Sequence, residues 1–281
     1  MIKVLSAGVL STIQDLGRFE WRHLGVPISG AMDSYAAKLA NQCLGNHPTD
    51  AVLEFTLLGP KLQFEINTQV CITGADFNAK LNQYSIIRNK PTAITKGDVL
   101  SFGPSQNGTR GYLAVANGFK TELVLNSRSM YANITKNTKL KKGDVLLAEK
   151  YTEPITAINS QVKPMNYKNS SFTVYKGPEF ELLNQDQLRQ LLNKSFSVSN
   201  TNNRMAYQLN ELILNELPSI ITSLVLPGTV QLTPSGTLII LMRDCQTTGG
   251  YPRVLQLSEQ GINLLSQKKV EDKIVFKLRN Y

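Results

Sequence analysis

The sequence predicts a mainly β protein in two halves, with a few short helices. Short apolar segments recur along the 281-residue chain, often about 8–12 residues apart and separated by Gly, Pro and Asn, which is typical of barrels and sandwiches. A pattern that begins Lys-Gly-Asp occurs twice and marks where strands begin. A polar segment that contains two prolines separates the halves. Together these observations predict β-barrel architecture in two halves.

The candidate strands are short segments rich in apolar and β-branched residues. They are Ile2–Leu5, Ala51–Thr56, Lys61–Glu65, Val70–Thr73, Val99–Phe102, Gly111–Ala116, Phe172–Tyr175, Val230–Thr233, Leu238–Met242 and Ile274–Leu278. A Gly-Asp turn should start a strand at Lys96–Leu100 and again at Lys142–Leu146. Val270–Ile274 is a degenerate third copy of this pattern, without the glycine.

Three segments are predicted to be helices. Residues 34–44 carry apolar side chains at helical spacing, with Asp33 as the N-cap and Gly45 as the C-terminal stop. Glu179–Asn193 carries five leucines and has a proline just before it. Ser258–Gln267 is the third and shortest predicted helix.

The polar segment between the halves runs over Glu149–Ser171 and has little periodicity. We therefore expect an N-terminal β-rich half over residues 1–150, which includes the helix near 34–44. A connecting segment is expected over 151–170, followed by a C-terminal β-barrel half over 171–281.

The net charge is +9, from 30 Lys and Arg against 21 Asp and Glu. The basic residues are spread along the chain, with only a loose lysine-rich patch at Lys136–Lys142. Because no RNP-like aromatic motif and no basic helix accompanies them, we expect no nucleic-acid partner. A solvated basic surface explains the charge, and an anion-binding cleft is the alternative.

The composition argues against metal and membrane binding. The two histidines, His23 and His47, have no Cys/His cluster around them, whereas a structural zinc site needs four N or S ligands. The three cysteines form an odd number without a CxxC motif, so we expect buried free thiols in a reducing cytoplasm. No apolar run approaches the roughly 18 residues that span a membrane. We expect a cytoplasmic protein that holds no metal and has no membrane partner.

A loop dense in Gly and Pro, His23–Asp33, leads into the first predicted helix. The N-terminus of that helix offers backbone N–H groups and a partial positive charge, which suit a carboxylate or a phosphate. His23 is either a proton-transfer residue or an ordinary loop histidine, and Asp33 is either catalytic or an N-cap. Glu54, in an otherwise apolar strand, either lies at a strand end or is paired in a cleft.

A second polar loop, Arg243–Pro252, directly follows the apolar segment Leu238–Met242. Its charged, amide and hydroxyl side chains suit the orientation of a small polar substrate, and Gly249 and Gly250 let the backbone approach a ligand. The alternative is a turn whose Asp and Thr side chains bond their own backbone. The GxSxG, Walker A and GxGxxG signatures are absent from the sequence.

The two loops belong to a pattern that extends over nearly the whole chain. Its segments are Thr12–Arg18, His23–Asp33, Leu39–Asn41, Gly45–Asn46, Leu53–Thr56, Gly59–Pro60, Arg110–Ala116, Ser127–Ser129, Val198–Ser199, Asn203–Met205 and Asp244–Pro252. This pattern resembles the biotin-dependent carboxyltransferase-like family. The resemblance implies cyclophilin-like β-barrel architecture, in agreement with the strand spacing.

The family includes one component of the bacterial ATP-dependent 5-oxoprolinase. The resemblance therefore implies the cleavage of 5-oxo-L-proline to L-glutamate, with ATP and Mg as co-substrate of a complex. It implies two partners: the B subunit, which is a related β protein, and the A subunit. No biotinyl-lysine context is present, so no biotin is expected on this chain. The alternatives are a regulatory protein that binds and antagonises a kinase-inhibitor partner, and the carboxyltransferase component of a urea-carboxylase-like enzyme.

The candidate site residues come from the two loops and the segments beside them. His23, Asp33 and Asp244 are the candidates for proton transfer. The candidate substrate-binding residues are Ser29, Gly30, Asn41, Glu54, Arg204, Gln246, Thr247, Thr248 and Tyr251. The sequence departs from the family where Cys245 replaces a common Arg, which removes a permanent cation. It also has Ala206 and Tyr207 where Gly and Arg are usual.

Overall fold

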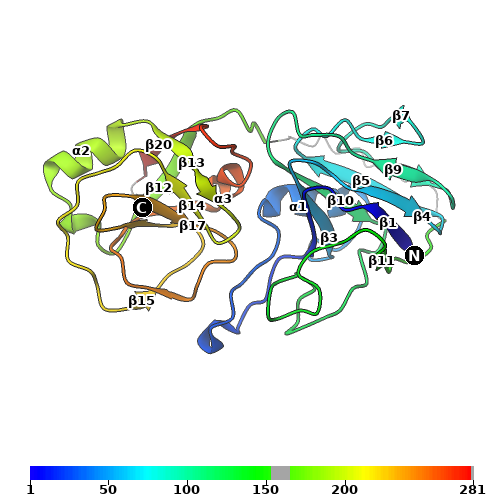
Figure 1. The fold of residues 1–281 in the computed structure, drawn as a ribbon, viewed down its shortest axis with the longest axis horizontal. Helices are drawn as coiled ribbons and strands as arrows, with labels where there is room; N and C mark the ends of the chain where they lie inside the picture. Colours follow the sequence, from blue (N-terminus) through cyan, green and yellow to red (C-terminus); the bar gives the residue numbers. More distant parts are fainter. Residues whose placement is uncertain (153–164, 280–281) are drawn as a thin grey trace. The chain divides into compact units, whose positions relative to one another are not determined.

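The computed structural model describes residues 1–152 and 165–279, and these form a mainly β structure, as predicted. The chain divides into two compact units (Figure 1). Unit 1 comprises Met1–Arg18 and Ser29–Asn166, and unit 2 comprises Phe19–Ile28 and Tyr167–Tyr281. Most of the expected connecting segment, 153–164, lies outside the described residues.

Unit 1 contains two antiparallel sheets. The six-stranded sheet has the order β11 (Val145–Leu146), β1 (Ile2–Ser6), β4 (Lys61–Phe64), β9 (Val99–Ser101), β6 (Lys80–Leu81) and β7 (Tyr84–Ser85). The five-stranded sheet has the order β2 (Leu10–Gln14), β3 (Val52–Thr56), β10 (Arg110–Val115), β5 (Thr68–Gly74) and β8 (Thr92–Ile94).

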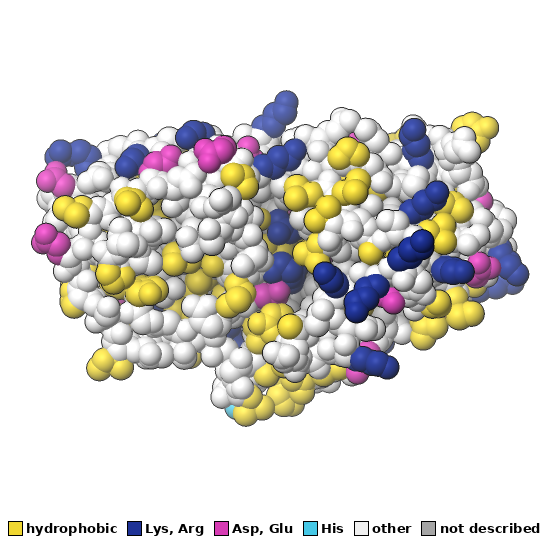
Figure 2. Space-filling view, in the orientation of Figure 1, with side chains coloured by type: hydrophobic (Ala, Val, Ile, Leu, Met, Phe, Trp, Pro, Cys, Tyr) yellow, Lys and Arg dark blue, Asp and Glu magenta, His cyan; other side chains and the backbone are white. Residues whose placement is uncertain are grey.

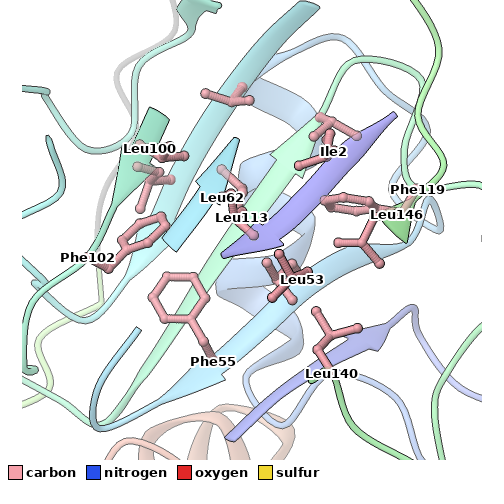
Figure 3. Close-up of a cluster of buried hydrophobic side chains, with 14 of the residues drawn as sticks. Ile2, Leu53, Phe55, Leu62, Leu100, Phe102, Leu113, Phe119, Leu140 and Leu146 are labelled. Atoms are coloured by element: carbon pink, nitrogen blue, oxygen red, sulfur yellow. The ribbon is translucent and has the colours of Figure 1, made fainter. Parts of the chain in front are cut away.

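The main core of unit 1 lies between these sheets (Figure 3). Successive residues of a strand point to opposite faces, so strand β10 supplies both faces of its sheet. Leu113 and Val115 belong to the core between the sheets, whereas Tyr112 and Ala114 belong to a cluster on the other face. That second face is where the candidate site residues of unit 1 gather.

Helix α1 (Ser34–Cys43) covers this second face. Its buried alanines pack against Val52, Tyr112 and Ala114, and the small side chains let the helix approach the sheet closely. The helix begins after Asp33, and Gly45 follows it with φ of 71°. The predicted helix over 34–44 and both of its end signals are confirmed.

The three copies of the Gly-Asp pattern adopt the same turn. In each, a backbone N–H donates to the Asp carboxylate at 2.8 Å: Thr95 to Asp98, Lys141 to Asp144, and Lys269 to Asp272. The turns lead into β9, β11 and β20. Gly97 and Gly143 have positive φ, and Glu271 occupies the equivalent position in the third copy with φ of 69°. The degenerate copy is therefore confirmed as the same turn.

Unit 2 is a closed barrel, which confirms the predicted barrel architecture. Its strands run in the order β12 (Ser171–Lys176), β19 (Arg253–Leu257), β16 (Thr229–Leu232), β17 (Leu238–Leu241), β14 (Ala206–Leu209), β13 (Phe196–Asn202) and β20 (Lys273–Leu278). A parallel pairing of β12 with β20 closes the barrel, and the other pairs are antiparallel. A separate pair joins β15 (Ser223–Leu224) to β18 (Thr248–Gly249).

The helices of unit 2 differ in one respect from the sequence prediction. The expected continuous helix Glu179–Asn193 is two elements, the 3-10 turn Phe180–Leu182 and helix α2 (Gln185–Asn193). The break occurs because Asn184 forms a reciprocal capping box with Gln187, which starts a new helix. The third predicted helix is present as α3 (Glu259–Leu265), which begins one residue later than expected, with Ser258 as its N-cap, and ends two residues earlier.

Candidate functional site

The candidate residues of unit 1 form a buried polar cluster beneath the start of α1. Glu54 of β3 and Tyr112 of β10 are register partners on neighbouring strands, and both point to the helix-covered face. The Tyr112 hydroxyl donates to Glu54 Oε2 at 2.8 Å, and the backbone N–H of Met32 donates to the same oxygen at 2.7 Å. Glu54 is only 2% exposed. Glu54 therefore lies within β3 and is paired, rather than lying at a strand end.

Tyr112 links the sheet to the helix start. Its hydroxyl oxygen accepts a hydrogen bond from the backbone N–H of Asp33 at 2.8 Å. Burial raises the pKa of Tyr112 well above its ordinary value, and the charges of Glu54 and Asp33 raise it further, against the opposing charge of Arg110. The phenol therefore stays protonated and remains a donor to the carboxylate.

Asp33 performs the capping role that the sequence allowed. Its Oδ1 accepts a hydrogen bond from the N–H of Ala36 at 3.0 Å, which satisfies one of the exposed N–H groups at the start of α1. Its side chain is fully buried. A proton-transfer role for Asp33 stays a prediction beside this cap.

The loop that leads to Asp33 is conformationally constrained. Ser29 has φ of 58° and Gly30 has φ of 88°. A Cβ on Gly30 would lie 2.7 Å from the backbone carbon of Leu16, so only glycine fits there without movement of the chain. Ser29 is fully buried, and its hydroxyl has no hydrogen-bond partner among the described residues. A buried hydroxyl without a partner is costly, and the substrate-binding role of Ser29 stays a prediction.

Asp15, which the sequence analysis did not single out, holds this loop in place. Its backbone oxygen accepts from Ala31 N–H at 2.8 Å. Its carboxylate accepts from the hydroxyls of Ser127 and Ser129 at 2.7 Å and from Arg128 N–H at 2.6 Å. Asp15 lies in the segment Thr12–Arg18 and the other three residues form the segment Ser127–Ser129. Both segments belong to the pattern quoted for the family resemblance, and this was the sequence signal that could have indicated their contact.

Asn41 lies near the far end of α1, away from the helix start. Its Nδ2 donates to the Asp50 carbonyl at 2.7 Å, and its Oδ1 accepts from Asn46 at 3.0 Å. Both ends of the amide are therefore engaged in fixing the turn after the helix. Its substrate-binding role stays a prediction.

The candidate residues of unit 2 are organised by one ion pair. Arg204 binds Asp244 with two parallel hydrogen bonds, Nε to Oδ2 at 2.7 Å and Nη2 to Oδ1 at 3.0 Å. The two side chains are 11% and 8% exposed. A third bond runs from the Asp244 N–H to the Arg204 carbonyl at 2.9 Å. Because both carboxylate oxygens accept from Arg204, the pair anchors the loop that follows Asp244. The proton-transfer role of Asp244 and the substrate-binding role of Arg204 stay predictions.

Arg22 holds the same loop from the Phe19–Ile28 segment. Its Nη2 donates to the Thr247 carbonyl at 3.1 Å and to the Val225 carbonyl. Burial raises the pKa of the Cys245 thiol to about 11, against the opposing charge and hydrogen bond of Arg22. The thiol is therefore uncharged at neutral pH. Arg22 thus places a cation beside Cys245.

Three further candidates of unit 2 are exposed. Gln246, Thr248 and Tyr251 present their side chains at the surface, and Thr247 is half-buried. Of these residues, Thr248 lies in β18, and the pairing of β18 with β15 fixes its backbone. His23 lies in the 3-10 turn Arg22–Leu24, exposed, with Nδ1 2.9 Å from the Glu20 carbonyl. A loop of fixed backbone with exposed polar side chains can orient a polar ligand.

The candidates thus fall into two sets. Ser29, Gly30, Asp33, Glu54 and Asn41 belong to unit 1. The members in unit 2 are His23, Arg204, Asp244, Gln246, Thr247, Thr248 and Tyr251. Within residues 1–152 and 165–279, no group of three or more His, Cys, Asp or Glu side chains could hold a metal ion. None of the helices in those ranges is long and apolar enough to cross a membrane.

Comparison with known proteins gives consistent relatives. Residues 24–278 match the family model for the carboxyltransferase domain, subdomain A and B. The chain is 31% identical to the C subunit of 5-oxoprolinase from Escherichia coli (strain K12) over 95% of this chain and 87% of that protein. It is 40% identical to urea amidolyase of Lachancea kluyveri over 51% of this chain and 8% of that protein.

Two solved structures extend the similarity to the fold. TTHA0988 superposes with a TM-score of 0.85 and 28% identity, over 98% of this chain and 55% of that one. The K. lactis urea amidolyase superposes with a TM-score of 0.87 and 27% identity, over 98% of this chain and 18% of that one. The chain thus spans about half of the first solved structure and less than a fifth of the second.

Proposed function

Because the chain belongs to the carboxyltransferase subdomain A and B family, we propose that it is a subunit of an ATP-dependent 5-oxoprolinase. With the A and B subunits as partners it would cleave 5-oxo-L-proline to L-glutamate, with MgATP as co-substrate of the complex. The observation that carries this proposal is the 31% identity to the C subunit of a 5-oxoprolinase along nearly the full length of both chains. The three free cysteines suit a reducing cytoplasm.

The chemical problem is an unstrained lactam whose amide resists attack by water. In the proposed sequence, the terminal phosphoryl group of ATP passes to the lactam oxygen and ADP leaves. Water adds to the activated carbon, the ring C–N bond breaks, and the nitrogen takes a proton. The resulting acyl phosphate is hydrolysed by a second water to the carboxylate and inorganic phosphate. The groups that this sequence needs are anion donors, an amide-orienting loop and a proton donor.

Unit 1 offers the anion donors. The unpartnered hydroxyl of Ser29 and the start of α1 suit the carboxylate of 5-oxoproline or the transferred phosphate. Glu54 and Tyr112 keep the loop and the helix start in fixed positions through Met32 and Asp33. In this proposal Glu54 and Tyr112 are positioning residues.

Unit 2 offers the orienting loop. Gln246, Thr248 and Tyr251 would bind the lactam amide, while Arg204 and Asp244 position the loop. His23 is our candidate for proton transfer, because its exposed ring leaves Nε2 accessible while Nδ1 contacts Glu20. A positioned proton donor contributes about 10²–10⁴-fold to a rate.

A second candidate function is carboxyl transfer to urea or a related amide. The 40% identity to a urea amidolyase over half of this chain favours it. Orienting an amide requires the same donors in both reactions, so the loop itself does not distinguish them. A requirement for carboxylated biotin would support this second candidate.

Reconstitution with each component omitted in turn tests the proposal. The purified A and B subunits are mixed with this chain, and 5-oxoproline-dependent ATP hydrolysis and glutamate release are followed together. We expect both activities to vanish without this chain. Equal activity of the two partners on their own would contradict the proposal. Activity on urea that needs carboxybiotin, with none on 5-oxoproline, would replace it with the second candidate.

A further inference from the structure

Unit 1 contains a cavity that no candidate site residue lines. It has a volume of about 270 Å³, and all its lining residues come from the segment 120–147. Buried Met130, Leu140 and Leu146 form its apolar floor. A concave pocket with an apolar floor and a few polar groups is the usual form of a small-molecule site.

The segment that forms the cavity is strongly basic. Residues 120–147 contain six Lys and Arg against two acidic residues, so they carry +4 of the net charge of +9. Lys136, Lys139, Lys141 and Lys142 are exposed. Figure 2 shows Lys and Arg side chains gathered over one face of unit 1. Such a field raises the local concentration of anions.

Arg128 supplies a directional anion donor in the cavity wall. Among the described residues its guanidinium donates to a single partner, the Thr121 carbonyl. Its remaining N–H groups suit the fork geometry with which arginine binds a carboxylate or a phosphate. Thr121 also lines the cavity, and its hydroxyl is buried without a partner among the described residues.

Lys120 adds a second cation to the wall. Its Nζ lies 3.6 Å from Glu149, but the two side chains are 38% and 54% exposed, so this ion pair is weak and leaves the ammonium group accessible. The two acidic residues of the wall are engaged with backbone groups. Glu122 accepts from Lys136 N–H at 3.3 Å, and Asp144 accepts from Lys141 N–H at 2.8 Å.

We propose that this cavity binds a small organic anion, a carboxylate or a phosphate ester with a short apolar body. Arg128, Lys120 and the Thr121 hydroxyl would hold the anionic group, and the carbon body would lie on Met130, Leu140 and Leu146. This site is independent of the proposed 5-oxoprolinase function, and either can fail without the other.

The test is a binding titration of the full chain with L-glutamate and succinate as carboxylate probes and glycerol 3-phosphate as the phosphate probe. Calorimetry is combined with NMR of 13C-methyl methionine, since Met130 is one of six methionines. We expect saturable binding of at least one probe, with a shift of the Met130 signal assigned by Met130→Leu. Preference for the carboxylates or for the phosphate identifies the class.

Three variants connect the binding to the cavity. Arg128→Met should weaken binding at least about tenfold, the loss of a charge-assisted contact. Asn137→Trp, at an exposed lining position, should block the cavity with its charges kept. Lys90→Met, an exposed lysine of unit 1 outside the cavity, should leave binding unchanged.

Two results would overturn the proposal. One is the absence of saturable binding and of any Met130 shift with all three probes. The other is binding that Arg128→Met and Asn137→Trp leave unchanged. Because the wild-type titration is itself decisive, a failure of Arg128→Met to fold would still leave the NMR result and Asn137→Trp as the test.

Discussion

The two units hold their polar groups in different ways. In unit 1, Glu54, Tyr112 and Asp33 form a buried network in which each group has more than one partner. In unit 2, a bidentate ion pair between Arg204 and Asp244 anchors the loop after β17, and Arg22 holds the same loop at Thr247. A network on a sheet face depends on strand register, whereas an ion pair depends on mutual neutralisation of two charges.

The difference determines which groups remain for a ligand. Beside the network of unit 1, the buried hydroxyl of Ser29 has no partner among the described residues. The ion pair of unit 2 fixes the backbone and leaves Gln246, Thr248 and Tyr251 at the surface. In unit 1 the available polar group is therefore buried and held in one position, whereas unit 2 presents exposed side chains on a loop whose backbone is hydrogen-bonded.

The largest effect should come from breaking the buried ion pair. Arg204→Met leaves the Asp244 carboxylate buried without its partner, which should lower the free energy of unfolding by about 3–5 kcal/mol. Urea unfolding measures the loss. The matched control is Arg189→Met. The side chains of Arg189 and Asp186, which form an ion pair, are 72% and 80% exposed, so this substitution should lower the free energy of unfolding by less than about 1 kcal/mol. Equal losses would mean that the loop does not depend on this pair.

The next effect tests the network of unit 1. Tyr112→Phe removes the donor to Glu54 and the acceptor for Asp33 N–H, which should cost about 1–3 kcal/mol of unfolding free energy. Tyr84→Phe is the control, because Tyr84 is 80% exposed. In the reconstituted complex, Tyr112→Phe should lower glutamate release as well. A variant as stable and as active as the control would show that the network is dispensable.

Two glycines of the segment His23–Asp33, one in each unit, sharpen the comparison between the units. Gly25 and Gly30 both have positive φ, of 77° and 88°. A Cβ added at Gly25 would meet nothing within 4 Å, whereas one added at Gly30 would lie 2.7 Å from the backbone carbon of Leu16. Gly25→Ala should cost about 1 kcal/mol for the backbone conformation alone. Gly30→Ala should cost at least about 1 kcal/mol more, because the chain must move. Thermal unfolding of both variants checks this, and equal shifts would contradict the constrained loop.

The smallest effect is a change in the stability of unit 2 with pH. Bidentate hydrogen bonding from Arg253 lowers the pKa of Glu179 below its ordinary value of 4.5. Because the folded pKa is depressed, the stabilisation is complete above the ordinary value and is lost as pH falls through the folded one. The stability difference between wild type and Glu179→Gln should therefore shrink only below about pH 4.5. A difference that is constant down to about pH 3 would contradict the pairing.

Local signals in the sequence predicted much of the fold. The cap at Asp33 and the stop at Gly45 marked the two ends of the helix between them. The two Gly-Asp turns and their degenerate copy without glycine marked three strand starts. The break before α2 was also readable, because Asn184 and Gln187 have capping-box spacing. These features depend on residues a few positions apart.

The contacts of the site were not readable in the same way. Tyr112 lies in an apolar strand, and only the register of β3 with β10 shows that it meets Glu54. Arg22 bonds Val225 and Thr247, which lie 203 and 225 positions away. Such partners depend on the closed topology, which no local pattern specifies.

In our proposal a 5-oxoprolinase cannot work without this chain. The most direct test is glutamate release from 5-oxoproline by the A and B subunits with MgATP, measured with this chain, without it, and with Ser29→Ala in its place. We predict full release with the wild-type chain, none without it, and reduced release with Ser29→Ala. Undiminished release in the absence of the chain would contradict the proposal.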